Sequence, residues 1–300
     1  MVSPNKQLSQ LGLAPSKARG QNFIQDPNIA RKIVEAIRLE ITDLKAIASV
    51  ATAQGATEPE VNQLAGGQVE IIEIGPGLGG LTKLILQHGL SVTAVELDRG
   101  LAENLRSWPE VKDEKLVVLN QDILTLNLAQ DLGLKKCLVC GNLPYNLSTP
   151  ILFWFMGQAQ VAGRGLFMLQ KEMAQRLAAK VGSRSYGRLS VAVSLWYEVK
   201  VVLDIPPTAF QPKPKVFSSL VSLKLKGEPP SSEERSALGR LTAAAFLARR
   251  KTILNNLSAG YGRNKALMAL EELKIDPGQR PETIEPQRLA KLATILEIKK

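Results

Sequence analysis

The chain has 300 residues, 45% of them hydrophobic, a mean hydropathy close to zero and a formal net charge of +10 at pH 7. This length and composition predict a soluble globular protein with a full core and room for a second, smaller domain. No apolar run approaches the roughly 18 residues of a membrane helix, and residues 1–10 lack the apolar core of a secretory signal. We therefore expect no membrane span and a cytoplasmic location.

The positive charge is unevenly distributed, because the excess of lysine and arginine over acidic residues lies after residue 170. The basic side chains there include Lys171, Arg176, Lys180, Arg184, Arg188, Lys213 and Lys215, and a second group is Arg249, Arg250 and Lys251. We expect a basic surface over 171–226, extended by the second group. On charge alone, an RNA-binding surface and ordinary solvated charges explain the pattern about equally well.

The cysteine and histidine content argues against metal or redox chemistry. Cys137 and Cys140 form a C-x-x-C inside an apolar strand, where residues three apart point to opposite faces, so we interpret both as core residues. His88 stands just before Gly89 at the end of a helical pattern, a position that favours histidine. We expect no metal site.

The first element in chain order is a helix that begins after Asp26. Asp26 and Pro27 have the features of an N-cap followed by proline at the first helical position, and apolar residues then recur on one face over 29–37. This pattern predicts a helix of about three turns. Residues 41–68 have weak periodicity, so we expect an inserted loop or an extra helix there.

Short apolar runs alternate with helical patterns in the middle of the chain. We expect five strands, over 69–74, 91–95, 116–119, 137–140 and 165–169. The alternation predicts a parallel α/β sheet. Two further strands over 199–203 and 219–225 predict a hairpin-like edge.

The segment 227–232 has the composition of a linker, and apolar residues recur at helical spacing beyond it. We therefore expect a first domain over 1–226 and a small all-helical domain over 233–300.

Candidate binding residues follow four of the predicted strands. In open α/β sheets, ligands lie beyond the carboxyl ends of the strands. The residues placed there are Gly75, Glu96, Asp122 and Asn142. Gly75 allows the backbone to approach a ligand closely. Glu96 lies about 20 residues further on, where it can accept hydrogen bonds from ribose hydroxyls. Asp122 can accept a hydrogen bond from an adenine amino group.

Gly75, Gly77 and Gly80 also satisfy the G-x-G-x-x-G pattern of dinucleotide-binding enzymes, so a nicotinamide or flavin oxidoreductase is an alternative. Glu73 stands two residues before the first glycine, where a phosphate would be repelled. A cationic ligand such as S-adenosylmethionine fits an acid at this position, and we favour that methyl donor.

Asn142, Leu143, Pro144 and Tyr145 form an N-x-P-Y segment after the fourth strand. This pattern is typical of enzymes that methylate an exocyclic amino group, although an ordinary turn uses the same residue types. The Asn142 side chain and the Leu143 carbonyl can accept the amino hydrogens, Pro144 enforces the turn, and Tyr145 can stack on the base.

The chain resembles the small-subunit ribosomal RNA adenine N6-dimethyltransferases in nine segments that occur in the same order. The segments are GQNFIQD (20–26), EIGPGLGGLT (73–82), VELD (95–98), GNLPY (141–145), QKEMAQRL (170–177), SYGRLSV (185–191), PPTAFQPKPKV (206–216), RRKTILNNL (249–257) and RPETI (280–284). Three features depart from the family pattern: Asn146 stands where the family often has a second aromatic, Phe217 stands where a small polar residue is usual, and 41–68 is longer than expected.

The resemblance implies a Rossmann-like S-adenosylmethionine-dependent methyltransferase domain with a small helical C-terminal domain. It implies a donor site formed by Asn22, Ile24, Gly75, Glu96, Asp122 and Asn142. It also implies a second stacking aromatic, Phe210, which would face the target base opposite Tyr145; a core aromatic is the alternative for Phe210.

The implied reaction is dimethylation of N6 on two adjacent adenosines near the 3′ end of small-subunit (16S) rRNA, in ribosome biogenesis, by a monomer. Two alternatives stay open: a large-subunit rRNA adenine methyltransferase of the antibiotic-resistance type, and a non-catalytic nucleic-acid-binding relative.

Overall fold

The computed structural model describes residues 3–14, 21–53 and 69–298, and these separate into two compact units. The first unit comprises residues up to 171 together with 201–224, and the second comprises 172–200 and 225–300. The sequence placed 172–200 in the first domain, whereas in the structure this stretch packs with the C-terminal helices. The domain bounds 1–226 and 233–300 stay a prediction about which parts fold independently.

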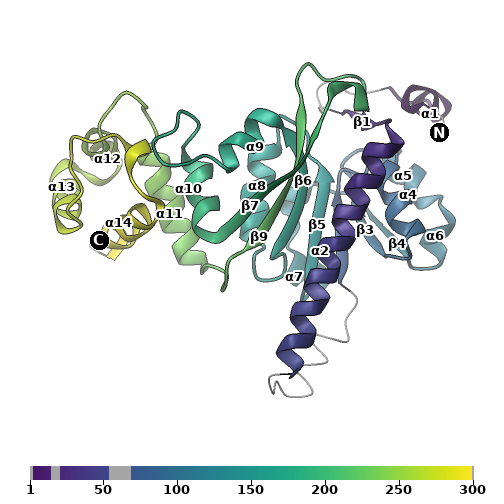
Figure 1. Cartoon of the computed structure of the whole chain (residues 1–300), viewed down its shortest axis with the longest axis horizontal. Helices are drawn as coiled ribbons and strands as arrows, with labels where there is room; N and C mark the ends of the chain where they lie inside the picture. The colour runs from purple at the N-terminus through teal and green to yellow at the C-terminus, as the bar shows by residue number, and fades with distance from the viewer. Residues whose placement is uncertain (1–2, 15–20, 54–68, 299–300) are drawn as a thin grey trace. The chain divides into compact units, whose positions relative to one another are not determined.

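A seven-stranded sheet with the strand order β4-β3-β2-β5-β6-β9-β7 forms the centre of the first unit, apart from the first four residues of β7 and the last residue of β9, which belong to the second unit (Figure 1). The strands are β2 (Glu70–Ile74), β3 (Val92–Val95), β4 (Leu116–Leu119), β5 (Cys137–Asn142), β6 (Arg164–Gln170), β7 (Tyr197–Ile205) and β9 (Ser218–Leu225). All five predicted central strands are present and pair in parallel. β9 pairs antiparallel with β6, and β7 follows β9 at the edge, so the predicted edge pair is confirmed.

Helices connect the parallel strands. They are α4 (Gly80–Gln87), α5 (Arg99–Arg106), α6 (Pro109–Lys112), α7 (Leu128–Leu132) and α8 (Ser148–Gly157), with a 3-10 turn η1 (Ile123–Thr125) after β4. Side chains of one sheet face join α2, α4 and α5 in a single core cluster, because alternate strand residues such as Leu138 and Cys140 point the same way. On β6, Phe167 meets Phe155 of α8 edge to face, with ring centroids 5.1 Å apart.

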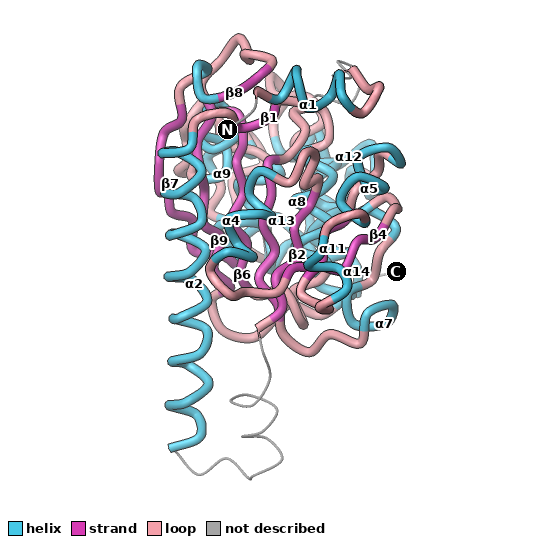
Figure 2. Tube along the Cα trace, turned by 90° about the vertical axis from the view of Figure 1, so that its right-hand side faces the viewer, coloured by secondary structure: helices cyan, strands magenta, loops and turns pink. Residues whose placement is uncertain are grey.

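Helix α2 (Pro27–Ala53) is much longer than the three turns that the sequence predicted. Asp26 caps its first turn as expected, because Asp26 Oδ1 accepts from the Asn28 N–H at 2.8 Å. The apolar face continues through Ile41 and Leu44, which are buried. Residues 41–53 are therefore a continuation of α2, and the remainder of the predicted insertion, 54–68, lies outside the described residues. Figure 2 shows α2 lying along one side of the sheet.

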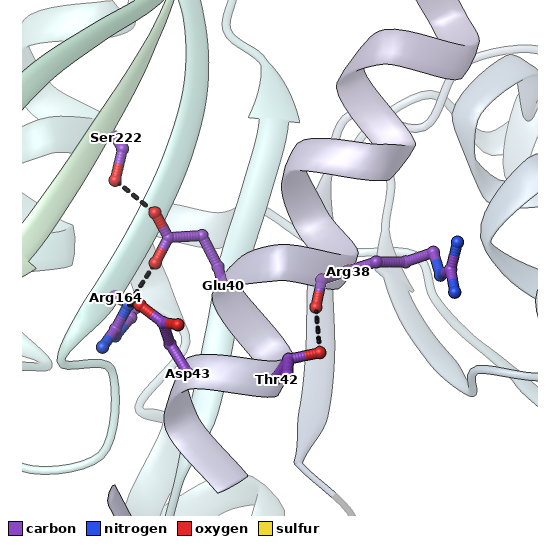
Figure 3. Close-up of polar contacts among 6 residues, drawn as sticks. All are labelled: Arg38, Glu40, Thr42, Asp43, Arg164 and Ser222. Atoms are coloured by element: carbon purple, nitrogen blue, oxygen red, sulfur yellow. Dashed lines mark hydrogen bonds and ion pairs between the residues drawn. The ribbon is translucent and has the colours of Figure 1, made fainter. Parts of the chain in front are cut away.

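A buried ion pair fixes α2 to the sheet. Arg164, at the start of β6, pairs with Glu40 of α2 and lies 3.5 Å from Asp43 (Figure 3). Glu40 also accepts a hydrogen bond from Ser222 Oγ of β9 at 2.7 Å. Because the Arg164 side chain is only 4% exposed, its charge depends on these partners.

Three short elements complete the first unit. Helix α1 (Pro4–Gln10) precedes β1 (Phe23–Ile24), which pairs antiparallel with β8 (Phe210–Gln211). The Gln25 N–H donates to the Ala209 carbonyl at 2.9 Å and extends this contact. Two segments that are remote in sequence are thereby joined.

The second unit is mainly helical. It contains α9 (Lys171–Leu177, from its second residue onward), α10 (Arg188–Trp196), α11 (Ser232–Ala245), α12 (Ile253–Tyr261), α13 (Arg263–Glu272) and α14 (Pro286–Ile298). Helices α10, α11 and α14 pack against one another. Ser231 caps α11 in a reciprocal capping box with Glu234. The predicted helical C-terminal region is confirmed. No helix among the described residues is long and apolar enough to cross a membrane.

We expect Glu40→Ala to lower the free energy of unfolding by about 3 kcal/mol, because it leaves the Arg164 charge buried without its main partner. Glu35→Ala is the matched control on the same helix: Glu35 pairs with Arg38 at the surface, and its loss should cost about 0.5 kcal/mol or less. Urea denaturation measures both. Equal, small effects would contradict a stabilising role for the buried pair.

Candidate functional site

A cavity of about 1320 Å³ lies in the first unit, at the carboxyl ends of the parallel strands. The strand order reverses there, because β3 and β4 extend from one side of β2 while β5 and β6 extend from the other. All six residues predicted for the donor site line this one cavity; they are Asn22, Ile24, Gly75, Glu96, Asp122 and Asn142. The residues come from separate strands and from the segment before α2, so the fold brings them together.

The glycine turn after β2 lines the cavity. Gly75 and Gly77 have φ values of +62° and +60°, in the left-handed region that favours glycine. The turn is anchored because the Gly75 N–H donates to the Val95 carbonyl at 2.9 Å. A Cβ on Gly77 would lie 2.8 Å from Cε1 of Phe23. The glycine therefore also allows β1 to approach the turn.

Carboxylates gather beside this turn. Glu73 is 2% exposed and accepts a hydrogen bond from Thr82 Oγ1 at 2.6 Å. Burial raises the pKa of Glu73 to about 7, although the Thr82 hydrogen bond opposes this shift and the nearby Glu96 adds to it. Asp122 lines the same cavity. The negative potential of these groups suits a cationic ligand and disfavours a pyrophosphate.

Glu96 organises the turn through both of its carboxylate oxygens. Oε2 accepts from the Gly77 N–H at 3.0 Å, and Oε1 accepts from the Asp98 N–H at 2.8 Å. Burial raises the pKa of Glu96, while these backbone hydrogen bonds lower it. Each carboxylate oxygen has a second lone pair, so Glu96 can accept further hydrogen bonds from a ligand.

Asn142 ends β5 at the edge of the cavity. Its Nδ2 donates to the Asn22 carbonyl at 2.6 Å, which fixes the side-chain amide and joins two predicted site residues. The preceding residue, Gly141, packs closely on β2: a Cβ there would lie 2.4 Å from the Ile74 carbonyl oxygen. The residue type at 141 therefore determines how near Asn142 lies to the glycine turn.

The turn after Asn142 is rigid. The Leu143 side chain is buried, and its N–H donates to the Met168 carbonyl at 3.2 Å. The Pro144 carbonyl accepts from the Leu147 N–H at 3.0 Å and from Ser148 Oγ at 2.9 Å, which starts α8. Pro144 also lines the cavity.

The two predicted stacking aromatics lie in different environments. Tyr145 is partly buried, and its hydroxyl is 3.0 Å from Ser218 Oγ; burial raises the pKa of the Tyr145 phenol. Phe210 is 1% exposed and belongs to the core cluster, opposite Ile24 in the β1–β8 pair. The structure thus shows Phe210 as a core residue, and its predicted stacking role requires a movement that exposes the ring.

Several cavity residues carried no site prediction from the sequence. Trp108 packs so closely on Gly79 that a Cβ there would lie 2.3 Å from the indole, and Gln7 and Gln10 of α1 also line the cavity. Leu97 lines the cavity directly after Glu96, and its place in VELD was an available signal. The short polar helix α1 has no comparable signal.

Neither cysteine suits metal chemistry. Both Cys137 and Cys140 are buried in β5, and burial raises the pKa of both thiols, that of Cys137 to about 12. Their predicted role as core residues is confirmed by this burial. Within the described ranges, no group of three or more histidine, cysteine or acidic residues could hold a metal ion.

The Glu73 carboxyl makes stability depend on pH. Its folded-state pKa lies above the ordinary value of 4.5, so the stability it contributes when protonated is fully present below about pH 4.5 and is lost as pH rises through about 7. We expect Glu73→Gln to become more stable relative to the wild type by on the order of 3 kcal/mol between pH 4.5 and 8. Denaturation at both pH values tests this. The surface acid Glu103 provides the control variant Glu103→Gln, and parallel behaviour of all three proteins would contradict the expectation.

Comparison with known proteins gives the family. The family profile described as ribosomal RNA adenine dimethylase matches residues 15–298. The ribosomal RNA small subunit methyltransferase A of Photorhabdus laumondii is 42% identical over 284 residues, which cover 93% of each chain. The enzyme of the same name from Legionella pneumophila is 38% identical over 284 residues, covering 94% of this chain and 98% of the relative.

Solved structures agree in fold. A dimethyladenosine transferase from Plasmodium falciparum has a TM-score of 0.66 at 22% identity, covering 92% of this chain and 98% of its own. The 23S rRNA methyltransferase ErmE has a TM-score of 0.57 at 21% identity, with 92% and 100% covered. These confirm the predicted methyltransferase fold. The profile match and the sequence relatives show that the chain belongs to the ribosomal RNA adenine dimethylase family.

Proposed function

We propose that this protein transfers methyl groups from S-adenosylmethionine to N6 of two adjacent adenosines near the 3′ end of small-subunit rRNA, during ribosome biogenesis in the cytoplasm. The observation that carries the proposal is that Asn142, in its N-L-P-Y turn, shares one cavity with Glu96 and Asp122. The names of the relatives support the small subunit as the substrate.

The acidic end of the cavity would hold the donor. Glu96 keeps lone pairs for the ribose hydroxyls after its two backbone hydrogen bonds. Asp122 Oδ1 accepts from the Leu124 N–H at 2.9 Å, which fixes the carboxylate and leaves Oδ2 for the adenine amino group. An ionised Glu73 would favour the positive charge of the sulfonium and amino groups.

The N-L-P-Y turn would hold the target base. Asn142 Nδ2 is already directed to the Asn22 carbonyl, so Oδ1 is the amide atom that can accept an amino hydrogen of adenine. The Leu143 carbonyl would accept the other. Two such acceptors favour a more tetrahedral, nucleophilic nitrogen and stabilise the positive charge that develops on it.

The chemical step is a direct displacement. A bond forms between N6 and the methyl carbon while the carbon–sulfur bond breaks, its electron pair returns to sulfur, and S-adenosylhomocysteine leaves. The positively charged nitrogen then loses a proton to water, so no dedicated general base is required. A base stacked in a duplex cannot reach the donor, and the target must be unpaired or extruded. Tyr145 would stack on it, and the contact with Ser218 would hold the ring.

Binding of the RNA backbone is assigned to basic side chains after residue 170. Lys180, Arg184, Arg250 and Lys251 are exposed in the second unit. Arg249 has a structural part as well, because it donates hydrogen bonds to the carbonyls of Arg184 and Tyr186. Phosphate contacts from such groups supply affinity without base specificity. We propose that the protein acts as a monomer.

The test of the proposed function is methyl incorporation from labelled S-adenosylmethionine into small and, separately, large ribosomal subunits that lack the modification, followed by nucleoside mass analysis. We expect dimethyladenosine in the small-subunit RNA. Incorporation only into large-subunit RNA would favour the alternative that the ErmE fold also permits. Donor binding without incorporation into either RNA would contradict the proposed reaction.

We expect Asn142→Ala to lower kcat by at least about 100-fold, because it removes an acceptor that acts on the developing charge. The affinity for RNA should change little, since phosphate contacts dominate it. Single-turnover methylation and filter binding measure the two quantities separately. Normal turnover by Asn142→Ala would exclude the mechanism.

A further inference from the structure

An exposed aromatic ring lies directly before the start of β9, next to Ser218, whose hydroxyl contacts Tyr145. Phe217 is 50% exposed, although a side chain of this size normally gains free energy from burial. It ends the loop that connects β8 to β9, within the first unit. Nothing in the proposed reaction uses this ring, and the core does not require it.

Lys171 fixes the position of Phe217. The Lys171 N–H donates to the Phe217 carbonyl at 2.9 Å, and Lys171 Nζ lies 5.9 Å from the centroid of the ring. The same ammonium group contacts Asp204 Oδ2 at 2.6 Å, and Asp204 Oδ1 accepts from Ser219 Oγ at 2.7 Å. Lys171 lowers the pKa of Asp204, so this carboxylate stays ionised. Lys171 therefore contacts both the backbone of Phe217 and one face of its ring.

The ring is coupled to the base-binding turn by one strand. Ser218 pairs with Gln170 in the β6–β9 ladder, and its hydroxyl contacts the Tyr145 hydroxyl at 3.0 Å. Phe217 directly precedes Ser218 in the chain, so the exposed ring and the Ser218–Tyr145 contact belong to neighbouring residues.

The surroundings of Phe217 are basic. Lys171, Lys213 and Lys215 are exposed on the same loop or beside it, whereas a surface for an apolar protein partner is normally depleted in lysine. An exposed aromatic ring with exposed lysines on the same loop is a combination that binds single-stranded nucleic acid, because bases stack on the ring while the cations contact the backbone. The chemistry therefore favours a nucleotide.

We propose that Phe217 is a substrate-positioning residue that stacks on an unpaired RNA base next to the target adenosine, with Lys213 and Lys215 contacting its phosphates. This inference rests on the proposed function, because it assumes that the target base lies at Tyr145. The free face of Phe217 carries the base, and Lys171 holds the ring for it. Phe217 would help to select an RNA in which the residue beside the target is also unpaired.

The test compares Phe217→Ser with Val216→Ser in the full-length protein, using small ribosomal subunits and S-adenosylmethionine. Val216 is the matched control, because it is 45% exposed on the same loop but cannot stack on a base. We expect Phe217→Ser to raise the KM for the subunit on the order of tenfold, because one base-stacking contact is lost. The kcat and the KM for S-adenosylmethionine should stay unchanged. Val216→Ser should resemble the wild type.

The conservative variant Phe217→Trp separates stacking from a structural role. Phe217→Trp should have the same KM for the subunit as the wild type, because tryptophan also stacks on a base. The fluorescence of the new indole should be quenched when RNA binds. Equal KM values for wild type and Phe217→Ser, or equal losses in Phe217→Ser and Val216→Ser, would overturn the inference and leave the proposed function intact. Absence of methyl transfer in the wild type would instead overturn both.

Discussion

The close contact between β2 and β5 is the constraint on which the site depends. These strands are neighbours in the sheet, yet the chain leaves them toward opposite sides, which opens a crevice at their carboxyl ends. Gly141 lies so near the Ile74 carbonyl that no larger residue fits without a shift of the backbone. The glycine turn after Ile74 and the Asn142 turn are therefore adjacent because the sheet itself is closely packed there.

Electrostatics then decides which ligand suits this crevice. The G-x-G-x-x-G spacing alone is compatible with a dinucleotide, but Glu73, two residues before the first glycine, is buried, and Glu96 accepts a hydrogen bond from the Gly77 N–H. Burial destabilises the ionised form of Glu73 and so raises its pKa. A cation bound nearby would stabilise that ionised form and lower the pKa again. The same acid that weakens the empty protein at neutral pH would thus strengthen its affinity for a sulfonium donor.

Much of this architecture was predictable because it depends on local patterns. The parallel strands follow from short apolar runs, and the six donor-site residues follow from their places after those strands or from the family motifs. The length of α2 was missed because residues 41–53 were grouped with 54–68 into one weakly periodic segment, although Ile41 and Leu44 continue the apolar face of the helix. Helix α1 and Trp108 reach the cavity only through tertiary packing. The burial of Phe210 could not be predicted from the sequence either, because a motif does not determine whether an aromatic ring is buried in the core or exposed in the site. The roles of the site residues remain predictions.

The two-residue ladder between β1 and β8 has a consequence for how the protein is made. Phe23 and Ile24, which cover the glycine turn and line the cavity, are held by Phe210 and Gln211, far along the chain. During synthesis these partners emerge long after the β2 and β5 turns, and contacts of such sequence separation form late because loop closure must be completed first. A ribosome-bound chain that already has its central parallel strands therefore still lacks the cover of its own cavity. The enzyme would acquire its full donor site only after most of the catalytic unit has been translated.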